Sequence, residues 1–522
     1  MGSLQPIREL SLYYMDTQEY KIESQLGKEI SNVEYSIFGF VLKGSVKIAL
    51  EVGNHRRSGK VTYGEVFYLP PNCRCTIQNR DKQPSRLIMI RFQCEERAHH
   101  SASSRQSVPF AMINELQLYH FRMPRIRNWV QDLLNDGLQQ EPSRHYLVYS
   151  YLYAIAAEFM AFIERPKAAE DELIDYVVQI KQDMLEHCSA AIDIEEVARL
   201  SGSSPARFYQ VFKQLTGLSP LKFMTMTRLN ESLHLLANNP SSIMDVAHSS
   251  GYLDELYFSR LFKKHMGISP TQYASAAKLR VANLCPVFQG DLSVLGITPV
   301  LELQREWYSD LDKDKYVKQI EQCQPELILT APVEENLYKR LSQICPVVMI
   351  HWKGYSWKER LLEISRIIRI PTVAERWLSY FQMKVENARA HIRRQLEDKP
   401  FLVVSVFERF FRVHGMQRIK MKDLFYDELQ ITPPASAYPI SFLDVSILDE
   451  LASMDCDHIL FLVPASFSDE SCIMLEENWS ELKRNRRRKH CIFIRHEEPL
   501  MYNASFYESL IDQFVNYLIV YR

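Results

Sequence analysis

FKQLTGLSP at residues 212–220 and FKKHMGISP at residues 262–270 are two copies of one pattern, F-K-x-x-x-G-x-S-P. Each copy follows a short stretch that ends in Ser-Gly, DIEEVARLSG from Asp193 and SIMDVAHSSG from Ser242. A pattern that recurs together with its upstream neighbour indicates a duplicated structural unit. We expect the remaining segments of the chain to control this unit.

Each copy is predicted to fold as two short helices joined by a tight turn, a helix-turn-helix. The pairs Asp193 with Glu196 and Ser242 with Asp245 match a capping box, in which side chains satisfy the free amides of a first helical turn. A glycine in each turn permits a sharp bend, and apolar residues at helical spacing form the inner face of each second helix. These residues are Gly202, Gly251, Phe208, Val211, Phe212, Leu215, Phe258, Leu261 and Phe262.

The outer faces of the two second helices carry polar and basic side chains that can contact base edges and phosphates in a major groove. They are Ala206, Arg207, Tyr209, Gln210 and Lys213 in the first copy, and Glu255, Tyr257, Ser259, Arg260, Lys263 and Lys264 in the second. Between the copies, residues 221–237 are predicted as one helix of roughly 25 Å. The alternative is an all-helical protein-binding module with solvated polar faces, but two matched turns and a rigid spacer favour DNA.

Residues 172–275 resemble the DNA-binding domain of the AraC/XylS family of bacterial transcription regulators, including Arg228-Leu229 and the closing Gly267-Ile268-Ser269-Pro270. The resemblance implies a set of base-facing positions, which are Ala206, Tyr209 and Gln210 in the first reading helix and Leu256, Ser259 and Arg260 in the second. Ala206 and Leu256 are small or apolar, so contact with a thymine methyl is expected there in place of a hydrogen bond.

A chain of 522 residues should divide into three or four domains. The formal net charge of −2 means that nucleic-acid affinity must come from a local basic face. Ten cysteines are scattered without zinc or disulfide spacing, which favours reduced thiols in the cytoplasm. The N-terminus lacks the apolar run of a signal peptide, and no stretch is expected to cross a membrane. A cytoplasmic protein without a membrane partner is predicted.

Residues 1–105 are predicted as a β-rich domain, because short alternating segments with Gly and Pro between them are typical of antiparallel strands in a small barrel. The stretch from Gly64 to Pro71 resembles the cupin-like front domain of AraC-type regulators. A metal site is not expected, since His55 stands alone. Packing, dimerisation and a second ligand remain open as its role. Residues 106–168 are predicted as a helical connector, followed by the double helix-turn-helix domain over residues 169–278.

Residues 280–522 alternate strand and helix signals, which predicts parallel α/β sheets in two lobes around one long helix from Thr372 to Leu396. This sensor segment resembles the periplasmic binding proteins for ferric siderophores and cobalamin. The motifs that carry the resemblance are LGITPV near Leu295, QPELILT at Gln324–Thr330, ICPVV at Ile344–Val348, WKERLLEI from Trp357, and Tyr502–Tyr507 within PLMYNASFYESL. The DNA-binding unit in front of it argues against delivery to a membrane transporter.

Ligands of two-lobed α/β proteins bind outside the carboxyl ends of the strands. Basic residues interleaved with aromatics follow several predicted strands, and they suit a bulky aromatic anion such as a ferric tris-catecholate. The candidate ligand-binding residues are Arg305, Trp307, Tyr308, Lys353, Arg409 and Arg412. The alternative is that these are surface residues at loop ends.

The resulting hypothesis is a one-component transcription regulator, an activator of iron-siderophore uptake genes, similar to the siderophore-responsive AraC-type regulators. Its expected partners are double-stranded promoter DNA, a ferric siderophore as effector and RNA polymerase, with a homodimer left open and no directly bound metal or cofactor. One alternative keeps the DNA-binding unit but gives the sensor segment a corrinoid or heme. Another is a siderophore-processing enzyme, although no G-x-S-x-G, H-E-x-x-H or dinucleotide pattern indicates catalytic residues.

Overall fold

The computed structural model describes residues 10–31, 35–52, 55–96, 117–123, 126–134, 142–164, 169–190, 192–238, 242–304, 307, 313–351, 356–483, 491–497 and 499–520. The chain packs as two compact units, residues 1–182 with 192–211, and residues 183–191 with 212–522. The predicted DNA-binding segment 169–278 is therefore shared between the two units, and its predicted boundaries stay a prediction.

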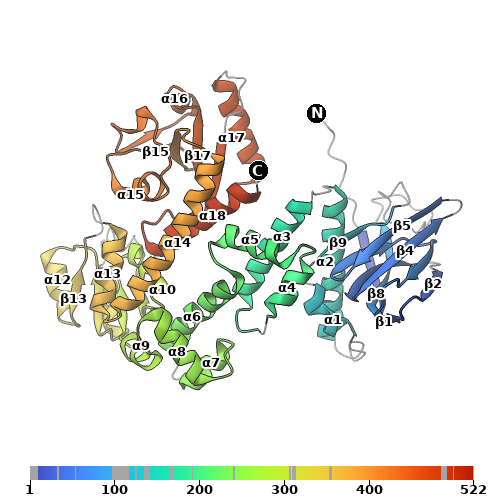
Figure 1. Cartoon of the computed structure of the whole chain (residues 1–522). Coiled ribbons are helices and arrows are strands. Elements are labelled where there is room, and N and C mark those ends of the chain that lie inside the picture. The colour runs from blue at the N-terminus through green and yellow to red at the C-terminus, as the bar shows by residue number, and fades with distance from the viewer. Residues whose placement is uncertain are drawn as a thin grey trace, which may run out of the picture. The chain divides into compact units, whose positions relative to one another are not determined.

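The first unit begins with two antiparallel sheets (Figure 1). The larger has the order β1-β8-β3-β6-β9 and the smaller the order β2-β7-β4-β5. The strands are β1 Leu10–Ile22, β2 Gly27–Ser31, β3 Ser36–Lys43, β4 Ser45–Val52, β5 His55–Thr62, β6 Glu65–Leu69, β7 Arg74–Gln78, β8 Ser85–Glu96 and β9 His120–Arg122. Antiparallel strands are confirmed. The described strands form two sheets instead of one closed barrel, and the cupin likeness stays a prediction.

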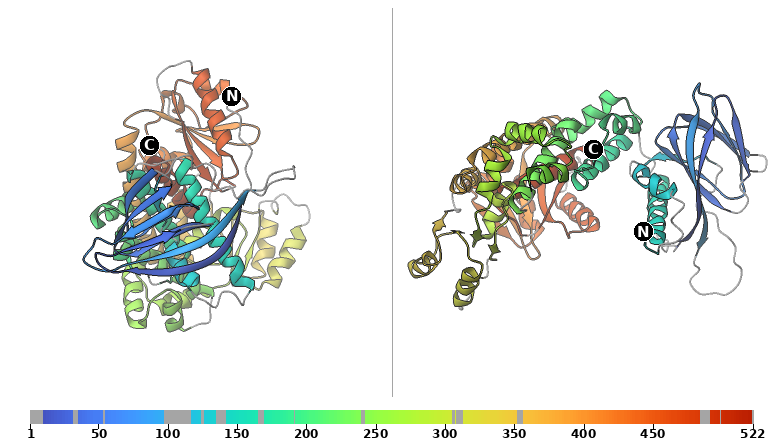
Figure 2. Two further views of the ribbon diagram at one scale, coloured as in Figure 1. Left: turned by 90° about the vertical axis from the view of Figure 1, so that its right-hand side faces the viewer. Right: turned by 90° about the horizontal axis from the view of Figure 1, so that it is seen from below.

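The larger sheet buries both of its faces. Ile37 and Val41 of β3 point toward the smaller sheet, whereas Phe38 and Phe40 join the cluster beneath the helices. This alternation follows from the two-residue period of a strand. The helices that cover the second face are α1 Ile126–Leu134 and α2 Pro142–Glu164 (Figures 1 and 2). The predicted all-helical connector is wrong at β9, which pairs with β6 as an edge strand of the larger sheet.

Helix α2 contains one stretch, His145–Ile163, that is long and apolar enough to cross a membrane by length and composition alone. The expectation that the chain has no such stretch is therefore wrong. Leu152, Ile155 and Phe159 of this helix are buried against the larger sheet, and the Leu12 amide donates to the Tyr153 hydroxyl at 3.0 Å. These contacts account for the buried side of the helix, whereas Tyr146 and Leu147 on the same stretch are exposed.

Helices continue through the centre of the chain. The first unit holds α3 Ala169–Glu186 up to residue 182, α4 Ile194–Leu200 and the start of α5 Pro205–Thr216. The second unit holds the end of α5, then α6 Pro220–Asn238, α7 Ile243–Ser249, α8 Glu255–Met266 and α9 Pro270–Ala277. The predicted spacer helix between the two copies is confirmed as α6.

The sensor segment contains two sheets, as predicted. The first has the order β11-β10-β12-β13, and every pair is parallel. Its elements are β10 Val281–Asn283, η2 Pro286–Phe288, α10 Gln289–Val294, β11 Leu301–Glu302, α11 Lys313–Gln322, β12 Leu327–Thr330, α12 Glu335–Ser342, β13 Val347–Met349 and α13 Trp357–Ile367. Short crossover helices join neighbouring strands, which is the connection that parallel pairing requires.

The second sheet has the order β16-β15-β14-β17-β18 and is mixed. Strands β14, β17 and β18 are parallel, but β15 and β16 pair antiparallel, so the prediction of purely parallel sheets is wrong here. Only residues 407–410 separate β14 from β15, and a turn this short cannot make a parallel crossover. The elements are β14 Phe401–Val406, β15 Phe411–His414, α15 Ile419–Lys422, η4 Asp423–Glu428 (a π-helical turn), η5 Ala435–Ala437, β16 Phe442–Val445, α16 Leu448–Ala452, β17 His458–Pro464, α17 Asp469–Leu482, β18 Cys491–His496 and α18 Ala504–Val520.

One long helix, α14 Pro371–Gln395, lies between the two sheets and confirms the predicted helix (Figure 1). It packs against α13 and α18, and Trp357 of α13 contacts both Phe381 of α14 and Tyr507 of α18. Nearby, the buried Arg360 guanidinium binds Asp291 at 2.6 Å and donates to the Tyr502 carbonyl at 2.5 Å. Burial raises the pKa of Asp291, and the paired charge opposes this rise.

Candidate nucleic-acid interface and ligand cavity

The first helix-turn-helix copy begins at the Asp193 cap. The Asp193 carboxylate accepts from the amides of Glu195 and Glu196, at 3.0 and 3.2 Å. A capping box also predicts a bond from the Asp193 amide to the Glu196 side chain. In the structure, the Glu196 carboxylate instead accepts a hydrogen bond from the Tyr63 hydroxyl of the β-sheet domain. Gly202, at φ +74°, then makes the turn that the sequence predicts.

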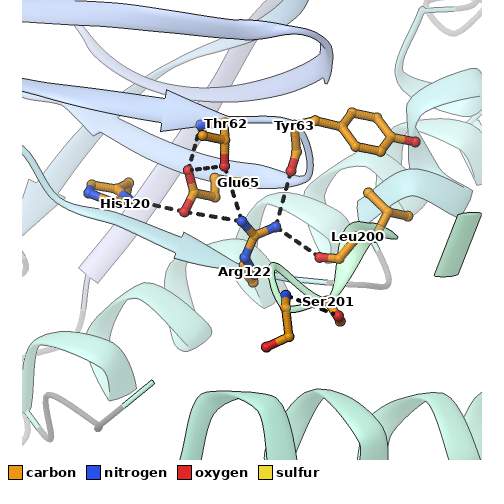
Figure 3. A network of polar contacts seen from close by, with 8 residues as sticks. Thr62, Tyr63, Glu65, His120, Arg122, Leu200 and Ser201 are labelled. Carbon is orange, nitrogen blue, oxygen red and sulfur yellow. Dashed lines mark hydrogen bonds and ion pairs between the residues drawn. The ribbon is translucent and has the colours of Figure 1, made fainter. Parts of the chain in front are cut away.

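Arg122 of β9 connects the β-sheet domain to the end of α4 (Figure 3). Its guanidinium donates to the carbonyl oxygens of Tyr63 at 3.0 Å and Leu200 at 2.8 Å. It also donates to the Thr62 hydroxyl at 3.1 Å and lies 3.4 Å from the Glu65 carboxylate. A side chain at Gly202 would collide with this guanidinium, so the turn needs glycine for space as well as for its backbone conformation.

Glu65 and His120 complete this network (Figure 3). Burial alone would raise the pKa of Glu65. The His120 ring, 3.4 Å away, the hydrogen bond from the Thr62 amide and the Arg122 charge lower it below its ordinary value. The contact with the Glu65 carboxylate in turn raises the pKa of His120. The carboxylate is therefore held ionised next to Arg122.

Helix α5 buries the predicted inner face, since Phe208, Val211, Phe212 and Leu215 are all core residues. Its outer face contains the predicted reading residues. Ala206, Gln210 and Lys213 are exposed, Arg207 and Tyr209 are half-buried, and Arg207 donates to the Gln210 side chain at 2.9 Å.

The second copy matches the predicted capping box fully, because Ser242 and Asp245 exchange both bonds. Gly251 turns the chain at φ +82°, and Asp254 then caps α8 by accepting the Tyr257 amide at 2.5 Å. The Asp254 cap was not predicted, although Asp directly before an apolar-periodic stretch is a known start signal.

Helix α8 exposes the residues that the sequence nominated. Arg260 and Lys263 are exposed, Ser259 is half-buried, Tyr257 is 55% exposed and Leu256 is 70% exposed. Leu253, in the turn before the helix, is 97% exposed and was missed. Leu253 falls outside the helical repeat of buried apolar positions in α8, and this is the sequence signal that could have identified it as an exposed residue. Exposed leucines here suit the methyl groups of thymine.

Arg228 of α6 holds the turn of the second copy. Its guanidinium donates to the carbonyl oxygens of Cys188 at 2.7 Å, Ala190 at 2.8 Å and Gly251 at 3.1 Å, and lies over the Tyr252 ring. Arg228 of the spacer helix therefore fixes this turn in place.

Of the six candidate ligand residues, the structure describes Trp307, Arg409 and Arg412. Trp307 is 1% exposed and donates its indole N–H to the Leu284 carbonyl at 2.7 Å within the core of the first lobe. In this structure the Trp307 ring therefore serves the core of the first lobe, and its predicted ligand contact stays a prediction. Arg305, Tyr308 and Lys353 lie outside the described residues.

Arg412 lines a cavity of about 190 Å³ in the second lobe. The cavity is lined by Phe407, Arg412, His414, Arg418, Lys420, Phe442, Pro499 and Leu500. Phe407 follows β14, and Pro499 and Leu500 follow β18, so the cavity lies beyond the carboxyl ends of two parallel strands. Arg409 is exposed on the turn between β14 and β15, outside this lining, and its predicted ligand role remains a prediction.

The Arg412 guanidinium is fixed in place. It forms a bidentate pair with Asp444, with both contacts at 2.6 Å, and lies 5.0 to 5.5 Å from the ring centres of Phe407, Phe410 and Phe442. Hydrogen bonding in this pair raises the pKa of Arg412 and lowers that of Asp444. The cation is therefore oriented before any ligand arrives.

The cavity carries more positive charge than the single Asp444 balances. Arg418 and Lys420 join Arg412 in its lining, and neither was predicted. The buried His414 bonds to Ser405 at 2.7 Å. Its pKa is lowered to about 3, first by burial and then by these three cations. The histidine stays neutral, and the cavity favours an anion.

Among the described residues, no group of three or more His, Cys, Asp and Glu could hold a metal ion. The described cysteines are free thiols, and seven of them are buried: Cys73, Cys75, Cys94, Cys285, Cys456, Cys472 and Cys491.

The chain is similar to known proteins over the duplicated unit and beyond it. Residues 197–276 match the family model described as a helix-turn-helix domain. The HTH-type transcriptional activator Btr of Bacillus subtilis is 24% identical over 361 residues, which cover 64% of this chain and 66% of that protein. The arabinose operon regulatory protein of Escherichia coli is 30% identical over 138 residues, covering 26% and 47%. The chain thus spans just under two thirds of the first relative and about half of the second.

Two solved structures align with nearly half of the chain. FhuD2 from Staphylococcus aureus with bound ferrioxamine B has a TM-score of 0.37 and 14% identity, covering 46% of this chain and 98% of that one. BSU3320 of Bacillus subtilis, a component of a ferrichrome transporter, has a TM-score of 0.36 and 20% identity, covering 45% and 91%.

Proposed function

We propose that this chain, which carries a helix-turn-helix domain of the AraC family, is a sequence-specific DNA-binding transcription regulator. One observation carries the proposal: each second helix, α5 and α8, buries its aromatic face and leaves polar and basic side chains exposed on the other. Exposed amide, hydroxyl and guanidinium groups on a helix suit base edges in a major groove. Such a role implies action in the cytoplasm, with RNA polymerase as a partner.

The DNA-binding part can be tested without knowing the operator. The full chain would be used to select duplexes from a random pool, and its affinity for the selected duplex would be compared with that for unselected DNA. We expect a preference of at least about a thousandfold at physiological salt. Equal affinity for both pools would reject sequence-specific binding.

We propose further that the sensor segment binds a ferric siderophore, with a catecholate preferred, and that the regulator activates iron-siderophore uptake genes. The cavity around Arg412 supports this, because guanidinium and ammonium groups beside aromatic rings suit an anion with flat rings. Its volume of about 190 Å³ is below the 300–1,000 Å³ typical of whole-ligand pockets, so we assign it to one arm of a larger ligand.

Calorimetric titration of the full chain tests this ligand class. Ferric catecholate, ferric hydroxamate and ferric citrate would be titrated beside heme and cobalamin. We expect saturable binding of the ferric catecholate and weaker binding of the other two ferric complexes. Binding of heme or cobalamin alone would assign the sensor to that ligand. No binding by any of the five would reject the sensor role.

A further inference from the structure

The helix between the two lobes also contacts the ends of both reading helices. Gly217 follows α5 and Gly267 follows α8, and these are the glycines of the repeated pattern. A Cβ built on Gly217 would lie 3.3 Å from Cβ of Asn387, and one built on Gly267 would lie 2.9 Å from Cβ of Thr372. Both glycine turns therefore pack closely on α14.

At the end of α5 the contact is a hydrogen-bonded cap. The last four carbonyl groups of a helix have no partner within it. Gln214 is in the last turn of α5, and its carbonyl oxygen accepts from Asn387 Nδ2 and from His391 Nε2, both at 2.8 Å. Helix α14 thus satisfies a carbonyl that α5 itself leaves unpaired.

The contacting residues lie along one side of α14. Thr372, Arg376, Met383, Asn387 and His391 are spaced by four or seven positions, which places them on one helical face. Thr372 and Asn387 are 387 − 372 = 15 positions apart, or about 22 Å along the axis at about 1.5 Å per residue. One continuous helix therefore joins two widely separated contact points.

Further contacts line the same face. The Lys222 ammonium of α6 lies 3.6 Å from the Met383 sulfur. Met226, Leu233, His265 and Met266 line a small cavity together with Trp377 and Tyr380 of α14. A neighbouring side of α14 contacts the second lobe, because the buried Lys384 pairs with Glu508 and Asp512 of α18 at 2.8 Å. Helix α14 is therefore attached to α18 as well as to the ends of the reading helices.

We infer that α14 sets the distance between the ends of the two reading helices, so that the sensor segment determines which spacing of DNA half-sites the chain accepts. Asn387 and His391 are the positioning residues of this contact. This inference rests on the proposed DNA-binding function. It adds a specificity determinant that lies outside the helix-turn-helix domain and touches no DNA.

The test measures tolerance to half-site spacing. Footprinting of the full chain would first locate the two half-sites of the selected duplex. Two base pairs would then be inserted between them, which rotates one half-site by about 70° relative to the other. We expect wild-type affinity to fall by about tenfold or more, and the affinity of Asn387→Ala/His391→Ala to fall by less than about threefold. An equal loss in both proteins would overturn the inference.

Three further variants serve as controls or as a substitute in this spacing test. His391→Gln retains a donor for the Gln214 carbonyl and should keep the wild-type spacing preference. Glu386→Ala changes an exposed position on α14 and should also behave as wild type. The single variant Asn387→Ala replaces a half-buried side chain and serves if the double variant does not fold. If no duplex is selected by the wild-type protein, the proposed DNA-binding function has failed and the inference falls with it.

Discussion

Arg122 donates a hydrogen bond of 2.8 Å to the carbonyl oxygen of Leu200, and this bond ties the β-sheet domain to the last turn of α4. The same guanidinium binds the Tyr63 carbonyl and lies against the Glu65 carboxylate. The β-sheet domain therefore fixes the turn that precedes the reading helix of the first helix-turn-helix copy. The matching turn in the second copy is held from inside the DNA-binding segment by Arg228.

Replacing Arg122 should loosen the first turn. Arg122→Ala removes a charge-assisted donor from two carbonyls and leaves Glu65 without its cation, which costs about 1–3 kcal/mol. Hydrogen exchange of peptides covering residues 194–203 should accelerate by about 5- to 150-fold. Arg86→Ala, which breaks an exposed ion pair with Glu19, is the control and should leave this exchange unchanged. Unchanged exchange in Arg122→Ala would contradict the role of the network.

Asp423 should make the stability of the second unit dependent on pH. Burial raises its pKa from 3.8 to about 6, although hydrogen bonds from Tyr502 and Tyr507 act in the opposite direction. The pKa of Asp423 is higher in the folded than in the unfolded protein. Its contribution to the free energy of unfolding is therefore greatest below about pH 4 and is lost as the pH rises through about 6. A rise of this size corresponds to about 3 kcal/mol.

Denaturant unfolding of wild type and Asp423→Asn at about pH 4 and at pH 8 measures this loss. The variant keeps a side-chain oxygen for the tyrosines but does not ionise, so the stability difference between variant and wild type should grow in the variant's favour toward pH 8. A difference that is the same at both pH values would show that Asp423 titrates normally.

Arg260→Ala should weaken binding to the selected duplex by about 1–3 kcal/mol and leave binding to unselected DNA nearly unchanged. The reason is that Arg260 is exposed on the outer face of α8, where a guanidinium can bind a base edge. Fluorescence anisotropy on both duplexes gives the two affinities, and Arg366→Ala on α13 is the matched exposed control. An equal loss on both duplexes would mean that Arg260 contacts phosphate only.

Arg412→Ala should weaken binding of the ferric catecholate by about 1.5–3 kcal/mol, the range for hydrogen bonds to charged groups. Arg418→Ala, which removes an exposed cation without a bidentate partner, should weaken it in the same direction. Calorimetry would compare both with Arg366→Ala, which should bind as wild type does. Arg409→Ala tests the remaining predicted residue, and normal binding there would remove Arg409 from the site. Wild-type binding by both Arg412→Ala and Arg418→Ala would exclude the cavity.

Local patterns predicted most of the duplicated unit. The glycine turns, the Ser242 cap, the buried faces of α5 and α8 and the long helix α14 all follow from spacing within about one helix. What the sequence did not indicate depends on residues far apart. Arg122 and Leu200 are 78 positions apart, and nothing in HFR or in ARLSG signals their contact.

The ligand cavity shows the same limit. Arg412 was identified because it follows a buried strand beside aromatic residues. Arg418 and Lys420 reach the same cavity only because β15 folds back antiparallel on β14, a pairing that the alternation of strands and helices did not predict. Trp307 was assigned to the ligand from the same kind of loop-end pattern, yet its indole lies in the core. Position after a strand indicates a candidate but does not give the direction of its side chain.

Footprinting of the full chain on the DNA upstream of its own gene, with and without a ferric catecholate, tests the central claim most directly. A double reading head under the control of the sensor segment predicts two protected segments about one helical turn, or 10–10.5 base pairs, apart. It also predicts that the ligand changes either the strength or the extent of this protection. Protection that is absent in both conditions, or identical with and without every ferric ligand that the chain binds, would contradict it.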